Sequence, residues 1–162
     1  MGTRCGTIDP SIVAYVVEQS GMSVAEVNDA LNKKSGLLGV SGVSNDARYV
    51  WEAADQGNER AKLAMELLVH NAKKIIGSYV AEMNGVDVLI FTAGLGENDR
   101  KTREAIASDL DFLGITFDKA ANDALTPGTP GVISTPDSKV AVLSIPTDEE
   151  FMIACDTEAL VK

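Results

Sequence analysis

Apolar residues recur every three or four positions in the first part of the chain, which is the spacing of one face of a helix. This period predicts helices over 11–20 and 24–34. Gly21 is placed to end the first helix, because glycine readily adopts the left-handed conformation found at helix ends. Ser23 and Glu26 have the spacing of a capping box and are expected to begin the second helix.

The stretch 37–46 carries two glycines among apolar residues and predicts a loop with an apolar body. Ser44 is placed to cap a helix over 45–56, which Gly57 ends. Residues 58–83 then predict one amphipathic helix of roughly seven turns. Its apolar stripe is either core or a partner surface, and it consists of Ala61, Leu63, Ala64, Leu67, Leu68, Ala72, Ile75, Ile76, Tyr79 and Val80.

The pattern changes after Asn84-Gly85. Residues 86–91 (VDVLIF) are too apolar for one face to lie in water, which predicts a central strand of the parallel type. A helix is expected over 97–114, with acidic residues at its start, where the helix dipole favours them. The remainder predicts short strands and a C-terminal helix, with strands over 114–118, 132–135 and 140–146 and the helix over 148–160.

This distribution of elements predicts the fold class. All of the expected strands lie in the second half, whereas the first half offers helices with apolar faces and no sheet for them to cover. A self-sufficient α/β domain usually alternates strands and helices from its start. We therefore expect a helix-rich α/β fold that begins in the middle of a larger domain.

Composition narrows the functional classes. The formal net charge of −10 disfavours nucleic acid and membranes as partners, although local amides, a metal ion and one or two arginines can still hold a nucleotide. Cys5 and Cys155 lie far apart and in no CxxC spacing, so neither a disulfide framework nor a zinc site is expected. The sequence has no run of about 18 apolar residues and no signal core. These features predict a cytoplasmic protein.

The segment FTAGLGEN at 91–98 is the first candidate site. It follows the expected strand, and its glycines would let backbone amides approach an anion at the start of the next helix. It lacks the Gly-Lys-Ser/Thr of a Walker A loop and the third glycine of a dinucleotide fingerprint. From the pattern alone, a ligand-binding loop and a plain strand-to-helix turn stay equally open.

Two arginines are further candidates. Arg48, with Asp46, opens a helix after a glycine-rich loop, where it could stack on a purine or pair with a phosphate. The alternative is a solvated charge pair. Arg4 stands between glycines, where a rigid exposed guanidinium could stabilise charge on a transferring phosphoryl group. Its alternative is an ordinary arginine in a fraying terminus.

Acidic residues follow the last expected strand. Carboxylates there could hold magnesium, but Thr147 and Glu150 also have the spacing of a capping box, which leaves Glu149 as the metal candidate. His70 is the sole histidine and lies among apolar residues, so a packing or surface role is expected rather than catalysis. Cys5 has no identifiable basic partner and is expected to be inert.

Taken in order, these segments resemble the acetate kinase (acetokinase) family. The resemblance rests on MGTRCGTIDP at 1–10, LNKKSGLLGVSG at 31–42, SNDAR at 44–48, NERAKLA at 58–64, FTAGLGEN at 91–98 and SIPTDEE at 144–150. It runs to about residue 153. It implies part of an actin-like, ribonuclease-H-like ATPase domain, from a superfamily whose members bind ATP and magnesium between two such domains.

The resemblance also implies roles for residues of this chain. Arg4 is similar to the arginine that stabilises the transferring phosphoryl group, and Glu149 is similar to a magnesium-associated glutamate. The segment that contacts the adenosine part of the nucleotide is matched by Asp46, Ala47 and Arg48. A second nucleotide-binding loop is matched by Gly94, Leu95, Gly96, Glu97 and Asn98, with leucine where many relatives have isoleucine.

Chains of the family are more than twice as long, and nothing here matches their N-terminal asparagine, substrate-binding arginine, catalytic aspartate or catalytic histidine. The resemblance thus implies that 1–162 is the C-terminal portion of the second actin-like domain, with its first strands missing. It implies reversible phosphoryl transfer between ATP and acetate, giving ADP and acetyl phosphate, in a homodimer, and an isolated chain without activity. A propionate or butyrate kinase on the same scaffold and a non-catalytic nucleotide-binding or dimerisation module are the alternatives.

Overall fold

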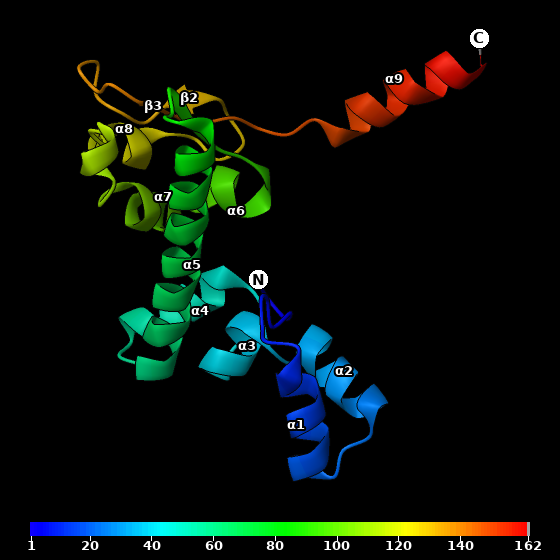
Figure 1. The fold of residues 1–162 in the computed structure, drawn as a ribbon. Coiled ribbons are helices and arrows are strands. Elements are labelled where there is room, and N and C mark those ends of the chain that lie inside the picture. The colour runs from blue at the N-terminus through cyan, green and yellow to red at the C-terminus, as the bar shows by residue number, and fades with distance from the viewer. Residues whose placement is uncertain (162) are drawn as a thin grey trace. The chain divides into compact units, whose positions relative to one another are not determined.

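A computed structural model describes residues 1–161 and divides the chain into two compact units, Met1–Lys74 and Ile75–Lys162. The first unit is helical (Figure 1). Its elements are α1 (Ser11–Ser20), α2 (Val24–Lys33), α3 (Gly36–Ser41), α4 (Ala47–Asp55) and the first part of α5 (Glu59–Met83). The helices expected over 11–20, 24–34, 45–56 and 58–83 are confirmed as α1, α2, α4 and α5.

Local capping explains where the first helices begin and end. The Ser23 hydroxyl accepts from the Glu26 N–H at 3.3 Å, and the Glu26 carboxylate accepts from the Ser23 N–H at 2.8 Å, so the predicted capping box is confirmed. Gly21 has φ 69° and its N–H donates to the Val17 carbonyl, which ends α1 as predicted. Both signals lie within four residues of the helix end, which is why the sequence alone reveals them.

The loop expected over 37–46 is wrong in its first half, because α3 is helical there. Leu37 is buried against the unit's core, which favours a helix that turns this side chain inward. The carbonyl end of α3 receives hydrogen bonds from the Arg60 side chain, from Nε to the Val40 oxygen at 2.8 Å and from a terminal nitrogen to the Gly39 oxygen at 3.0 Å. These tertiary contacts offset the poor helix propensity of the two glycines.

The cap of α4 also differs from the expectation. Asp46, not Ser44, is the N-cap, and its carboxylate accepts from the Arg48 N–H at 2.9 Å. Ser44 instead accepts from the Asp46 N–H at 3.1 Å, two residues before the cap. Two polar side chains therefore satisfy donors at this helix start, and the residue nearer to the helix is the cap.

The first residues of the chain lie against α2 and α3. The Leu37 and Leu38 N–H groups donate to the carbonyls of Met1 and Gly2 at 3.0 and 3.1 Å. Gly36 makes this approach feasible: it has φ 60°, and a Cβ there would lie 2.3 Å from the Met1 oxygen. The N-terminal segment is therefore held by backbone hydrogen bonds and is no fraying terminus.

The core of the first unit involves only the beginning of α5. The buried cluster is formed by Leu37, Ala47, Val50, Ala61, Ala64 and Met65. Later apolar residues of the helix are open, with Ile75 55% and Tyr79 62% exposed. The stripe read from the sequence is thus only partly core: Ala61 and Ala64 are buried, whereas Leu63 and Leu67 are exposed. Met65, which the stripe did not include, is buried as well.

The second unit contains a three-stranded sheet in the order β1-β3-β2. β1 (Val88–Phe91) pairs in parallel with β3 (Ala141–Ser144), and β2 (Gly131–Val132) pairs antiparallel with β3. The parallel pairing of β1 is confirmed. Its expected central position is wrong for the described sheet, because β1 has β3 as a neighbour on one side only and exposes Val88 and Ile90.

The other elements of this unit are helical. They are α6 (Ala93–Asn98), α7 (Arg100–Ala107), the 3-10 turn η1 (Asp111–Leu113), α8 (Lys119–Ala124) and α9 (Glu149–Val161). The single helix expected over 97–114 is wrong. Asp99 leaves the helical conformation (φ −108°, ψ 87°) and caps α7 by accepting from the Thr102 N–H at 3.0 Å. The expected strand at 114–118 is reduced to one bridge between Phe117 and Ser134, and α8 was not expected.

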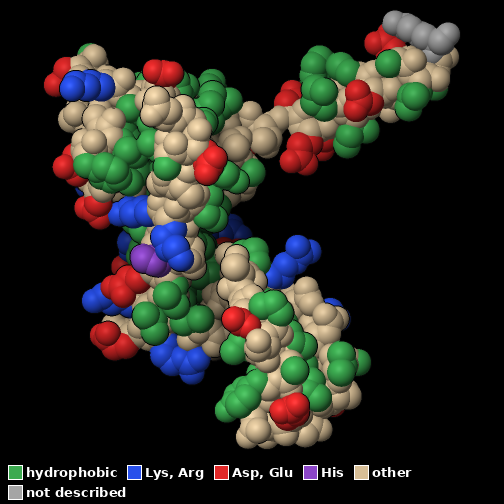
Figure 2. Space-filling model, in the orientation of Figure 1, with side chains coloured by type: hydrophobic (Ala, Val, Ile, Leu, Met, Phe, Trp, Pro, Cys, Tyr) green, Lys and Arg blue, Asp and Glu red, His purple; other side chains and the backbone are tan. Residues whose placement is uncertain are grey.

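The C-terminal helix is confirmed as α9, and it buries none of its described residues. Figure 2 shows its apolar side chains uncovered, with carboxylates between them. No helix within residues 1–161 has the length and apolarity that crossing a membrane requires. The helix-rich α/β class predicted from the sequence is confirmed.

Candidate functional site

The two parallel strands of the second unit end at the same edge of the sheet. Phe91, the last residue of β1, is in register with Ser144, the last residue of β3, and the Ile145 N–H donates to the Phe91 carbonyl at 2.9 Å. The segments that leave this edge are the beginning of α6 and residues 145–148, which lead to α9. Carboxyl ends of adjacent parallel strands are where open α/β sheets bind ligands, so this edge is the candidate site.

A hydrogen bond joins the two segments. One carboxylate oxygen of Glu97 accepts from the Thr147 N–H at 2.7 Å and from the Thr147 hydroxyl at 3.0 Å. The Thr147 N–H is the main reason that the pKa of Glu97 lies below its ordinary value. Glu97 is therefore an ionised anchor between the segment after β1 and the segment after β3.

This contact corrects the expected capping box of Thr147 and Glu150. Thr147 is engaged with Glu97, and the start of α9 is satisfied instead by Asp148, whose carboxylate accepts from the Phe151 N–H at 3.1 Å. Glu149 is the first residue of α9 and is exposed. Its carboxylate is open to solvent at the end of the segment that Glu97 holds.

The glycine segment after β1 is a short helix and not an open loop, because Gly94, Leu95, Gly96, Glu97 and Asn98 all belong to α6. The turn into it is made by Ala93 in the left-handed conformation, with φ 58°. Gly96 is packed on β1, since a Cβ there would lie 3.0 Å from the Phe91 carbonyl carbon, whereas a Cβ at Gly94 would meet nothing within 4 Å. Of the two glycines, only Gly94 is open to a ligand.

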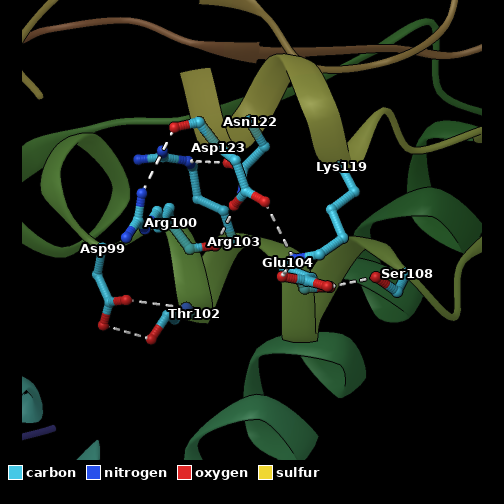
Figure 3. A network of polar contacts seen from close by, with 9 residues as sticks. All are labelled: Asp99, Arg100, Thr102, Arg103, Glu104, Ser108, Lys119, Asn122 and Asp123. Carbon is cyan, nitrogen blue, oxygen red and sulfur yellow. Dashed lines mark hydrogen bonds and ion pairs between the residues drawn. The ribbon is translucent and has the colours of Figure 1, made fainter. Parts of the chain in front are cut away.

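A residue that the sequence reading did not single out supports α6 from inside the unit. Arg103 of α7 is 2% exposed, and one of its terminal nitrogens donates to the Gly96 and Glu97 carbonyls at 2.8 and 2.9 Å. Its Nε donates to the Asn122 side-chain oxygen at 2.8 Å (Figure 3). Burial lowers the pKa of the guanidinium, and Asp99 acts in the opposite direction. The signal in the sequence is its spacing, because Arg103 has the helical period of Ile106 and Leu110.

The first unit holds the other predicted residues. Arg48 lies at the start of α4 with its side chain 80% exposed, and its Nε lies 3.1 Å from both oxygens of Asp46. This forked contact lowers the pKa of Asp46 to about 2. Asp46 thus both caps the helix and fixes the guanidinium of Arg48, while Ala47 between them is buried.

Arg4 is exposed in the N-terminal segment of the same unit. This segment passes close to the start of α4, because a Cβ at Gly2 would lie 2.7 Å from the Asn45 oxygen. The structure therefore brings the Arg4 segment and the Asp46–Arg48 segment together in the first unit. It brings Gly94–Asn98 and the Glu149 segment together in the second unit.

The His and Cys side chains of the described residues are the remaining candidate ligands or nucleophiles. Within residues 1–161 no three His, Cys, Asp or Glu side chains are grouped as they would be around a metal ion. His70 is exposed on α5, as the surface alternative predicted. Cys5 and Cys155 are free thiols and half-buried.

Comparison with known proteins gives a family. The sequence model described as "Acetokinase family" matches residues 1–155. The acetate kinase of Porphyromonas gingivalis is 49% identical over 162 residues, which are all of this chain and 40% of that protein. The chain thus spans about two fifths of the length of this curated relative.

Solved structures agree. The crystal structure of the Porphyromonas gingivalis acetate kinase superposes with a TM-score of 0.92, covering 100% of this chain and 40% of that one. A propionate kinase from Francisella tularensis superposes with a TM-score of 0.84 at 43% identity, covering 95% of this chain and 38% of that one. On the extent of the family match and these identities, the chain belongs to the acetokinase family.

Proposed function

We propose that this chain is the nucleotide-side, C-terminal portion of an acetate kinase, within the second of two actin-like domains. The observation that carries the proposal is the contact between Glu97 and Thr147 at the carboxyl ends of β1 and β3. It holds together the two segments that resemble nucleotide- and magnesium-contacting segments of the family, at the edge where such sheets bind ligands. Similarity to acetate kinases along the whole chain supports the same function.

The proposed reaction is reversible phosphoryl transfer. A carboxylate oxygen of acetate bonds to the γ-phosphorus of ATP, the bond from that phosphorus to the bridging oxygen breaks, and ADP leaves with the bond's electron pair. Catalysis of such a transfer depends on positioning and on neutralising the charge of the phosphoryl oxygens. Arg4 is the proposed source of positive charge, because its exposed guanidinium belongs to a segment that backbone hydrogen bonds hold in place.

Nucleotide-contacting residues are proposed in each unit, taken separately. Arg48 offers an exposed planar guanidinium held by Asp46, which suits stacking on the adenine or contact with the adenosine part. In the second unit, Gly94 leaves its backbone open to close approach, and Gly94–Asn98 is the proposed second contact.

Magnesium is the proposed cofactor. Mg²⁺ usually keeps several waters and binds through one or two carboxylates together with substrate phosphates, so it does not need a cage of protein ligands. A single exposed carboxylate, Glu149, fits that donor set, in line with the lack of any group of three ligands among residues 1–161. When bound, the ion would neutralise charge on the phosphates of the nucleotide.

The groups that bind acetate are proposed to lie in the region of the relatives that this chain does not match. Kinase activity would then require that region in the same protein, which we propose to be a cytoplasmic homodimer. A hydroxamate assay with ATP, magnesium and acetate tests this. We expect no turnover by the 162-residue chain alone and turnover once the missing region is joined to it; turnover by the chain alone at the level of intact family members contradicts the proposal.

Nucleotide binding can be tested on the chain itself. Titration calorimetry with magnesium-ADP should give saturable binding, and Arg48→Ala should weaken it about tenfold, which is typical for loss of one stacked or charge-assisted contact. Lys62→Ala, which removes an exposed positive charge from α5, is the matched control and should bind as the unchanged chain does. A chain that binds no nucleotide at millimolar concentration would contradict the proposed role.

Two further candidates have specific support. The superposition with a propionate kinase supports propionate or butyrate as an alternative substrate to acetate. Activity of the joined protein with acetate, propionate and butyrate distinguishes these substrates. The exposed apolar residues of α5 and α9 support a dimerisation module. Light scattering at several concentrations tests it, and a strictly monomeric protein counts against it.

A further inference from the structure

Arg103 is a charged side chain in a place where the helix pattern calls for an apolar one. It lies on α7 with the buried residues Ile106 and Ala107, and only 2% of it is exposed. A guanidinium stays protonated in proteins, so its burial is costly unless its N–H groups find acceptors. An apolar side chain at such a position would often be at least as stabilising. The acceptors that the Arg103 N–H groups bind should therefore explain why an arginine is present.

Those donors hold the carbonyl end of α6. One terminal nitrogen donates to the Gly96 and Glu97 carbonyls, and Nε donates to the Asn122 side-chain oxygen. Asn122 is itself fully buried, and its amide nitrogen donates to the Arg100 carbonyl at 3.0 Å. Figure 3 shows Arg103 and Asn122 turned toward each other between α7 and α8. The guanidinium is thus fixed from one side by Asn122 and fixes α6 on the other.

Side-chain contacts support α6: the Asn98 amide donates to the Gly94 carbonyl at 2.9 Å, and Arg103 binds carbonyls near the end of the helix. The helix has six residues, two of them glycines, and its first flanking residue, Thr92, provides no side-chain cap. Isolated helices of this length are unstable in water, because the few hydrogen bonds they form do not offset the free-energy cost of nucleation. A positive group at the carbonyl end satisfies acceptors that have no partner within the helix and interacts favourably with the negative end of the helix dipole.

The same carbonyls decide how the segment faces the site. In a trans peptide the N–H points away from the carbonyl of the preceding residue, so a fixed carbonyl also fixes the direction of the next N–H. Arg103 binds two successive carbonyls, those of Gly96 and Glu97. The backbone of Glu97 is therefore held from behind, while its carboxylate reaches Thr147 on the candidate site's edge.

We propose that Arg103 is a positioning residue of the nucleotide site: from inside the second unit it holds Gly94–Asn98 in the one conformation that meets the nucleotide. It touches no substrate itself. The inference rests on the proposed function for its effect on binding, whereas the ordering of α6 by Arg103 stands separately. Asn122 is part of the same support, because it orients the guanidinium.

The test compares Arg103→Met with Arg100→Met in the 162-residue chain. Both remove one arginine from α7, but Arg100 is exposed and makes only a long contact, at 3.5 Å, with the Asp123 carbonyl. Amide hydrogen exchange and the dissociation constant for magnesium-ADP are measured well below the unfolding temperature of each protein. Arg103→Met should speed exchange over 94–99 at least tenfold and weaken magnesium-ADP binding at least tenfold, while exchange in α2 and α4 stays unchanged.

Arg100→Met should leave both quantities within twofold of the unchanged chain. Arg103→Lys is the conservative variant, and it should give intermediate values, because an ammonium keeps the charge but cannot serve Asn122 and both carbonyls together. If Arg103→Met does not fold, Arg103→Lys carries the test on its own. Values for the lysine variant equal to those of the unchanged chain would then overturn the inference.

The outcomes separate the two proposals. A folded Arg103→Met protein with unchanged exchange over 94–99 overturns the ordering role. Faster exchange with unchanged magnesium-ADP affinity overturns the positioning role and leaves the proposed function standing. If the unchanged chain binds no magnesium-ADP, the proposed function fails, and the exchange measurement alone decides whether Arg103 orders α6.

Discussion

The chain contains one local arrangement twice, once in each unit. Helices α3 and α6 each have six residues, two of them glycines. The carbonyl end of each is bound by an arginine from a later helix, which is α5 for α3 and α7 for α6. Arg60 serves α3 and Arg103 serves α6. Neither helix would be expected from propensity, so both depend on contacts from outside themselves.

The two arrangements differ in their access to water. Arg60 is exposed, and water can take its place at the α3 carbonyls if it is removed. Arg103 is buried together with Asn122, so the groups that it serves would be left without partners. An arginine bound to helix carbonyls therefore adds little to stability at the surface, as Arg60 does, and more in the interior, as Arg103 does. The buried Arg103 is the one that supports the candidate site.

The largest effect is expected from Asn122→Ala. It leaves Nε of Arg103 unpaired in a buried place, which should lower the free energy of unfolding by about 2–3 kcal/mol. Urea unfolding followed by circular dichroism measures this. Asn71→Ala, an exposed change on α5, is the control and should stay within about 0.5 kcal/mol. Equal losses of unfolding free energy in the two variants would show that the buried hydrogen bonds of Asn122 stabilise no more than an exposed side chain does.

The two glycines of α6 should separate packing from ligand access. Gly96→Ala pushes a methyl group onto the Phe91 backbone and should cost about 1–3 kcal/mol. Gly94→Ala meets nothing and should leave stability unchanged or raise it by up to about 1 kcal/mol. Its affinity for magnesium-ADP should nevertheless fall, as measured by titration calorimetry. A Gly94→Ala chain that binds as tightly as the unchanged one would show that the nucleotide does not approach there.

A smaller effect is expected on the α3 side. Arg60→Ala removes two hydrogen bonds at the surface and should lower the free energy of unfolding by about 0.5–1 kcal/mol. Lys62→Ala removes an equal charge two residues later on α5, from a side chain that lies 3.9 Å from Glu66, and serves as the control. The comparison of the units breaks if Arg60→Ala costs as much as Asn122→Ala in the same urea experiment.

The smallest effect concerns the charge at the start of α4. The pKa of Asp46 is lowered to about 2 in the folded chain, so its ionised form stabilises the fold above about pH 4, and this contribution is lost as the pH falls toward about 2. Trp51, the sole tryptophan, lies in α4 and reports on it by fluorescence. The stability difference between the unchanged chain and Asp46→Asn should shrink over this pH window. A difference that is constant with pH would exclude the carboxylate as its source.

Short-range features were predictable from the sequence. The capping box of Ser23 and Glu26, the end of α1 at Gly21 and the long period of α5 depend on residues within a few positions of one another. The parallel pairing of β1 was predictable as well, because its residues are almost uniformly apolar. The edge position of β1 was not, since strand order depends on residues about 50 positions away.

The site was predictable as segments but not as an arrangement. The glycines of 91–98 left a ligand-binding loop and a plain strand-to-helix turn equally open, and the sequence could not reveal that Arg103 binds the carbonyl end of a short helix there. Likewise Thr147 and Glu150 matched a local capping pattern, but Thr147 donates instead to the carboxylate of Glu97, 50 residues earlier. In both cases a tertiary partner overrode a local preference.

The bond between Glu97 and Thr147 also has a consequence for how the chain folds. It closes a connection of 50 residues, as the parallel pairing of β1 with β3 does, and such distant contacts are slow to form because chain entropy opposes them. The helices between them, α6 to α8, involve neighbours in sequence and can form earlier. A nascent chain would therefore acquire its helical content before it acquires the edge proposed to meet the nucleotide, so that recovery of binding during refolding should lag behind recovery of the far-ultraviolet signal.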